Sequence, residues 1–231
     1  MCGDARKVPG REVVVKADNE LQHDVFDEIR CDPCTRHAKV EVFAKGGNVT
    51  LIGFTTTYSQ RWAAEQAALK VAGVRGVTND LEVRTSYSDR RGDTEIAQAA
   101  GHMLQWHVFV PPDHIRVAVA NGWVTLGGSV EWRYQKEAAE DAVRYLTGVR
   151  GVSNLISVEP TASAEGVSGR IEEALRRNAR LETSGVTVEA HGNTVVLRGT
   201  VRSFAERQET ERVAWSAPGV SRVENHVAIS P

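Results

Sequence analysis

The sequence has no long apolar run. No stretch approaches the roughly 18–20 consecutive apolar residues that a membrane-spanning helix needs. The first segment, MCGDARKVPGREVVVKAD, has no apolar core like that of a secretory signal, and Cys2 follows no such core. We therefore expect no transmembrane segment and a cytoplasmic location, or a periplasmic one if a leader was removed before residue 1.

Charge imbalance, paired cysteines and catalytic motifs are also missing. The formal net charge is −2 over 231 residues, so no basic field attracts nucleic acid, and we expect no nucleic-acid partner. Three cysteines are an odd number, which argues against a disulfide framework. The chain has no GxSxG, Walker loop, HExxH or GxGxxG after a strand. These absences predict a protein that is not an enzyme and holds no cofactor.

The sequence does contain two phrases that each occur three times. The first phrase reads GNVTLIGFT at 47–55, GWVTLGGSV at 122–130 and NTVVLRGTV at 193–201. The second reads GVRGVTNDLEV at 73–83, GVRGVSNLISV at 148–158 and GVSRVENHVAI at 219–229. Both phrases recur at spacings of 75 and then 71 residues. Two phrases that share both spacings indicate three tandem repeats.

Each copy predicts the element order α-β-β-α-β. Alternating apolar residues mark the strands, and a Gly or Asn turn joins the first two. The expected helices are 19–30, 93–106 and 167–178, then 59–72, 134–147 and 205–217. The predicted fold class is α+β, with three tandem units, each a small three-stranded mixed sheet with two helices packed on one face.

The expected domain boundaries follow from the repeat. They are an N-terminal extension at 1–17 and repeats at 18–84, 93–158 and 167–230, joined by polar linkers. A unit of roughly 60–65 residues buries only a thin core by itself. We therefore expect the copies to pack together or against a partner.

Nine recurring polar and glycine positions are predicted to be structural. Gly53, Gly128 and Gly199 end the second strand, where we expect a side chain to obstruct the helix that passes over it. Gly73, Gly148 and Gly219 are expected to end the second helix. Asn79, Asn154 and Asn225 begin the last strand on its inward face. A buried amide needs hydrogen bonds, so we expect this side chain to bind a nearby turn's backbone, with a ligand role as the alternative.

The repeated pattern closely resembles the BON domain, named for bacterial osmotically inducible and nodulation proteins. The resemblance covers about residues 18–230 and rests on the GNVTLIG-type strand, the Ala-rich helix and the GVRGVTN phrase in all three copies. It implies a non-enzymatic binding module of the kind implicated in phospholipid-membrane association and envelope maintenance under stress. One relative is implicated in potassium sensing.

Candidate binding residues gather near the start of each second helix. They are Tyr58, Trp62, Trp132, Tyr134 and Phe204, with Arg133 and Arg207 among the cations beside them. Amphipathic rings next to arginine suit a lipid headgroup layer or a protein interface. The alternative is that each ring covers the edge of its own small core.

The predicted function is therefore a stress-associated binding protein that contacts a phospholipid membrane surface or envelope components. Two alternatives remain from the sequence. One is a cytoplasmic scaffold that binds protein partners through open sheet edges or helix faces. The other is a sensor of a small ligand or a cation such as potassium.

The motif CDPC suggests a metal or redox site. Cys31, Cys34 and His37 have the spacing C-x2-C-x2-H of possible zinc ligands, and C-x-x-C also occurs in redox sites. The repeat spacing sets Cys31 against Trp106 and Cys34 against Phe109. Because buried cysteine behaves as a small apolar residue, this correspondence favours core packing and no metal, with the zinc set as the alternative.

Overall fold

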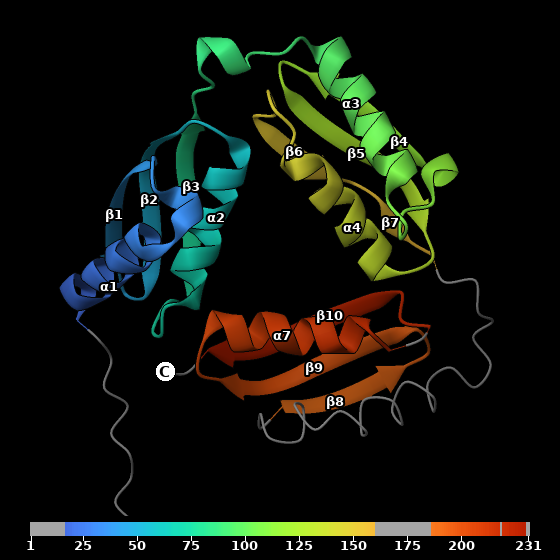
Figure 1. Cartoon of the computed structure of the whole chain (residues 1–231). Coiled ribbons are helices and arrows are strands. Elements are labelled where there is room, and N and C mark those ends of the chain that lie inside the picture. The colour runs from blue at the N-terminus through green and yellow to red at the C-terminus, as the bar shows by residue number, and fades with distance from the viewer. Residues whose placement is uncertain (1–16, 160–185, 218, 230–231) are drawn as a thin grey trace, which may run out of the picture.

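A computed structural model describes residues 17–159, 186–217 and 219–229. The chain forms three small sheet-and-helix units, which we call unit 1 (17–85), unit 2 (92–159) and unit 3 (186–229) (Figure 1). The predicted α+β class with three repeated units is confirmed. None of the helices in these described ranges is long and apolar enough to cross a membrane.

Unit 1 has the complete predicted element order. Its elements are α1 (Asp18–Cys31), β1 (Lys39–Lys45), β2 (Asn48–Thr55), α2 (Tyr58–Lys70) and β3 (Gly76–Val83). The hairpin β1–β2 is antiparallel, and β2 pairs with β3 in parallel, which gives the sheet order β1-β2-β3. The core lies between this sheet and the two helices, and Val25, Leu51 and Ala64 are among its fully buried members.

Unit 2 repeats this plan with an interrupted last strand. Its elements are α3 (Asp93–Trp106), β4 (Ile115–Ala120), β5 (Trp123–Val130), α4 (Arg133–Arg144), β6 (Gly151–Asn154) and β7 (Ser157–Val158). Both β6 and β7 pair in parallel with β5, so they follow one another along the same side of that strand. The 3-10 turns at Tyr87–Asp89 and Pro112–His114 precede α3 and β4.

Unit 3 shows the same sheet in its described part. Its elements are β8 (Val186–His191), β9 (Thr194–Val201), α7 (Phe204–Trp215) and β10 (Arg222–Ile229). The strand β9 pairs with β8 antiparallel and with β10 in parallel. The predicted helix 167–178 and most of the N-terminal extension lie outside the described residues.

The glycine that interrupts each second strand is required by the neighbouring strand. Gly53, Gly128 and Gly199 have φ of +132°, +122° and +137°, which favours glycine. A Cβ on Gly53 would lie 2.0 Å from the Lys39 carbonyl oxygen, and one on Gly128 would lie 2.0 Å from that of His114. The expectation that a helix blocks a side chain here is wrong, because the obstacle at Gly53 and Gly128 is the backbone at the start of the first strand.

The repeated asparagine joins the last strand to the second helix. Asn79 Nδ2 donates to the Arg61 carbonyl oxygen at 3.1 Å and to Glu65 Oε2 at 2.9 Å. Its Oδ1 accepts from the Leu81 amide at 3.3 Å. Asn154 repeats all three bonds with Lys136, Glu140 and Ile156, and Asn225 bonds Glu211 and the Val227 amide. The amide is bonded as expected, but its partner is a helix and not a turn.

Candidate binding surfaces

The predicted binding residues are distributed over three junctions between units. At the first junction, Arg144 at the end of α4 lies over the Trp62 ring of α2, 4.0 Å from the ring centroid. Arg144 is only 7% exposed and is ion-paired with Glu140 and Asp141 of its own helix. Tyr58 packs against the core of unit 2, and this burial raises its pKa above the ordinary value, with Glu140 acting in the same direction. The rings of Tyr58 and Trp62 therefore cover a neighbouring unit.

The second junction has the opposite arrangement of cation and ring. Arg133 at the start of α4 lies over the Trp215 ring at the end of α7, 5.2 Å from the centroid. Its Nε also donates to Glu137 at 2.8 Å. Trp132 and Tyr134 line one side of a groove of about 480 Å³ whose other side includes Trp215. This junction is more open than the first.

The third junction joins unit 3 to unit 1. Phe204 at the start of α7 packs against the core of unit 1, a cluster that includes Leu69 at the end of α2. The helices α2 and α7 are in contact. Arg207 turns inward, and its Nη2 donates to the Asn225 carbonyl oxygen of its own unit at 3.2 Å.

The three junctions join equivalent positions of the repeat. Residues 58, 133 and 204, the head positions, open the second helices; residues 69, 144 and 215, the tail positions, lie in their last turns. Each head lies in a junction with the end of another unit's second helix, and the three units form a closed ring (Figure 1). The expectation that the copies pack together is met by these contacts.

A separate set of apolar side chains is exposed in unit 2. We define the unit 2 corner as Trp106, Val108, Phe109 and Tyr134. Their exposed fractions are 86%, 91%, 58% and 50%. The Phe109 ring meets the Tyr134 ring edge-on at 5.9 Å between centroids, and Tyr134 stacks on Trp132 at 6.5 Å. Of the predicted binding residues, Tyr134 belongs to this corner, and sequence reasoning missed the other three members.

The position of Trp106 follows from the helical period. Ile96, Ala100 and Leu104 recur every four residues and form the buried stripe of α3. Trp106 comes two residues after the last of them and therefore points away from the core. Val110 is the buried anchor of the following segment, which leaves Val108 and Phe109 outside. The period of α3 indicates that Trp106 is exposed, although the apolar residues aligned with the cysteines had suggested burial.

The interpretation of the CDPC cysteines as core residues is wrong. Within the part of the chain that the structure describes, Cys31 and Cys34 form no disulfide, and both are exposed. Trp106 and Phe109, at the equivalent positions, are exposed as well. Throughout the described ranges, no three His, Cys, Asp or Glu side chains are grouped to hold a metal ion. The alternative zinc set of Cys31, Cys34 and His37 is therefore not assembled. Cys2 lies outside the described residues.

The sequence and fold were compared with known proteins. The profile of the BON domain matches residues 17–85, 92–160 and 163–231. Osmotically-inducible protein Y of Escherichia coli K12 is 29% identical over 141 residues, which cover 58% of this chain and 70% of that protein.

Two solved structures of CdsD, described as a structural protein of the type III secretion system of Chlamydia trachomatis, align at 15% identity. They cover 91% and 92% of this chain and 92% and 98% of theirs, with TM-scores of 0.24 and 0.25, too low to inform the arrangement of the units. Because the BON profile matches nearly the whole chain in three successive segments, the protein belongs to the BON domain family, with three tandem copies.

Proposed function

We propose that this protein is a non-enzymatic, stress-associated binding protein that attaches to phospholipid membrane surfaces through the unit 2 corner. The BON family and the osmotically inducible relative are not enzyme families, and the relative's name supports the stress association. The observation that carries the proposal is the exposure of Trp106, Val108 and Phe109 side by side in the sequence, with Tyr134 against Phe109.

The corner has the chemistry of a membrane-interface anchor. Tryptophan and tyrosine rings have an apolar body and a polar end, which suits the boundary between lipid tails and headgroups. Burying a large apolar side chain gains about 1.5–3 kcal/mol, so two rings supply useful affinity. The equivalent positions of unit 1 hold Cys31 and Cys34, so that unit lacks this anchor.

The contacts of the arginines give the proposed attachment a mainly apolar character. Arg133 contacts Glu137 and Trp215, and Arg207 is bonded to the Asn225 carbonyl oxygen. Because these cations already have partners in the protein, headgroup charge contributes little. We therefore expect vesicle binding to change little between low and high salt, since screening acts on charges and not on apolar burial.

Vesicle flotation with the double variant Trp106→Ser/Phe109→Ser tests the proposal. The probe is vesicles of phosphatidylethanolamine and phosphatidylglycerol. We expect the partition coefficient to fall at least about tenfold, as the loss of two anchoring rings implies. The matched control is Tyr145→Ser/Leu155→Ser, which removes two side chains that are 67% and 70% exposed elsewhere in unit 2. All four side chains are exposed, so the melting temperature should not change.

Two results would contradict the proposal. One is wild-type protein that fails to float with the vesicles, and the other is a corner variant that floats as well as the control. A stoichiometric protein partner that binds through the corner without lipid would support the scaffold function instead.

A further inference from the structure

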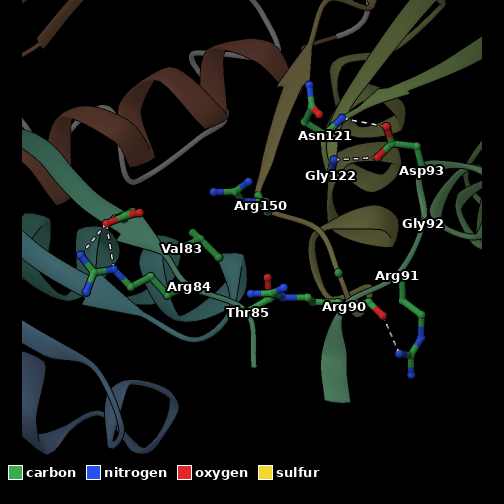
Figure 2. Close-up of a pocket in the computed structure, with 12 residues that line it drawn as sticks. Val83, Arg84, Thr85, Arg90, Arg91, Gly92, Asp93, Asn121, Gly122 and Arg150 are labelled. Carbon is green, nitrogen blue, oxygen red and sulfur yellow. Dashed lines mark hydrogen bonds and ion pairs between the residues drawn. The ribbon is translucent and has the colours of Figure 1, made fainter. Parts of the chain in front are cut away.

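A second candidate site lies between unit 1 and unit 2. It is a pocket of about 680 Å³ formed by the end of β3, the linker before α3 and two turns of unit 2 (Figure 2). Four arginines line it, namely Arg84, Arg90, Arg91 and Arg150, and we call it the arginine pocket. The only carboxylates in its lining are Glu82 and Asp93. The pocket therefore has a net positive lining in a chain whose net charge is −2.

Both carboxylates are already engaged. Asp93 accepts a hydrogen bond on each of its two oxygens, from the backbone amides of Asn121 and Gly122, both at 2.8 Å. Glu82 is ion-paired with Arg84 at 2.7 Å. Neither carboxylate forms an ion pair with another arginine of the pocket. The positive charge of the remaining arginines is therefore not neutralised within the lining.

Two of those arginines are placed to act together. In the described part of the chain, Arg90 and Arg150 form no ion pair; Arg90 lies over the Tyr87 ring, 5.7 Å from its centroid. Figure 2 shows both side chains extending toward the Val83–Thr85 end of unit 1. Arg91 is held differently, because its Nη1 donates to the carbonyl oxygens of Ser88 and Arg90, each at 2.9 Å.

Unpaired guanidinium groups in a concave site favour an anion with several acceptor oxygens. The planar donor fork of arginine matches phosphate geometry, and the concave wall strengthens the field that attracts the anion. The volume is within the ordinary range for small-molecule sites and exceeds that of a single inorganic ion. Thr85 adds a hydroxyl group to the lining from unit 1.

We propose that the arginine pocket binds the phosphate group of a small phosphorylated molecule or of a lipid headgroup. Arg90 of the linker and Arg150 of unit 2 bind the phosphate oxygens, facing the end of β3 in unit 1. A bound ligand therefore links the two units. This site is separate from the unit 2 corner, and its calorimetric test does not depend on the proposed attachment to membranes.

Calorimetric titration of the full chain with inorganic pyrophosphate tests this site. We expect saturable binding at about 150 mM KCl, weakened about tenfold or more in Arg90→Gln and in Arg150→Gln, because each substitution removes charge-assisted hydrogen bonds. Arg75→Gln is the matched control, since Arg75 holds the same place in the unit 1 phrase GVRGV and lies outside the pocket. It should bind pyrophosphate as wild type does.

Vesicles distinguish the two sources of phosphate. If pyrophosphate releases the protein from phosphatidylglycerol vesicles and Arg150→Gln floats poorly, the ligand is a headgroup. If pyrophosphate binds but flotation depends only on Trp106 and Phe109, the ligand is a soluble phosphorylated molecule. No saturable pyrophosphate binding by wild type, or equal binding by wild type, Arg90→Gln and Arg150→Gln, overturns the proposal. Failure of the corner variant to lose flotation bears only on the proposed function.

Discussion

The first and second junctions use equivalent positions with exchanged chemistry. At the first, the head position holds a ring, Tyr58, and the tail position holds a cation, Arg144. At the second, the head holds the cation Arg133 and the tail holds the ring Trp215. The first junction buries its arginine to 7% exposure, whereas the second leaves a groove of about 480 Å³.

In these two junctions the complementary pair, a cation and an aromatic ring, is retained, while the residue type at each position of the repeat is not. No single residue type recurs at the head or at the tail, yet the first two junctions each join a guanidinium group to an aromatic ring. The third joins Phe204 to an apolar cluster that includes Leu69. Such matching favours the correct neighbour, because a cation-to-cation meeting of Arg133 with Arg144 would be repulsive.

The largest expected effect comes from breaking the first junction. Arg144→Ala removes the contact with Trp62 and two ion pairs of a nearly buried guanidinium group. We expect the free energy of unfolding to fall by about 2–4 kcal/mol, measured by urea denaturation. Arg212→Ala is the control, because Arg212 pairs with Glu209 on the same kind of helix but is 59% exposed. It should cost less than about 1 kcal/mol, and equal losses in the two variants would contradict the comparison.

A smaller effect is expected at the second junction. A double-mutant cycle of Arg133→Ala and Trp215→Leu measures the coupling between the two side chains. Because this contact borders an open groove, we expect a coupling of about 0.5–1 kcal/mol, typical of an exposed cation over a ring. A coupling as large as the loss from Arg144→Ala would remove the distinction between a closed and an open junction.

The smallest effect concerns the titration of Tyr58. Its pKa in the folded protein is raised above the ordinary value of 10.0, chiefly by burial. Below about pH 10 the Tyr58 phenol is neutral in both the folded and the unfolded chain, so its ionisation does not lower the free energy of unfolding. As the pH rises from 10 through the folded pKa, the unfolded chain loses the proton more readily and stability falls.

Tyr58→Phe tests this alkaline effect. The variant should lose less stability than wild type between about pH 8 and about pH 11, because it has no phenol to ionise at this junction. Tyr87→Phe is the control, since Tyr87 is 89% exposed. Its pH dependence should match that of wild type. A Tyr58→Phe variant that loses as much stability as wild type would show that Tyr58 ionises as freely in the folded chain as in the unfolded one.

The repeat made the interior of each unit predictable from the sequence. Each described α-helix begins within one residue of its expected start, as α3 does at Asp93. Alternation and helical spacing report burial within a unit, so they locate Leu51, Leu126 and Leu197 in three equivalent cores. Backbone obstacles are harder to infer, which is why the obstacle at Gly53 was assigned to a helix.

Contacts between units were not predictable in the same way. The sequence grouped Tyr58, Trp62 and Phe204 as candidate binding residues, but which surface covers them depends on how the three units meet. The alignment of Cys34 with Phe109 also misled, because it assumed that an apolar residue at the equivalent position marks a buried site. Both residues are exposed, and the spacing of Ile96, Ala100 and Leu104 was the better guide to that end of α3.

Ring closure through Phe204 limits how many copies this architecture accepts. With each second-helix start already docked on a neighbour, a fourth copy would find no vacant place without displacing an existing contact. In a chain shortened to the first two copies, Leu69 and Arg133 would lose their partners in unit 3. Each end of that chain would then expose an uncovered docking surface. With three copies, each second-helix start has a neighbouring unit to dock on.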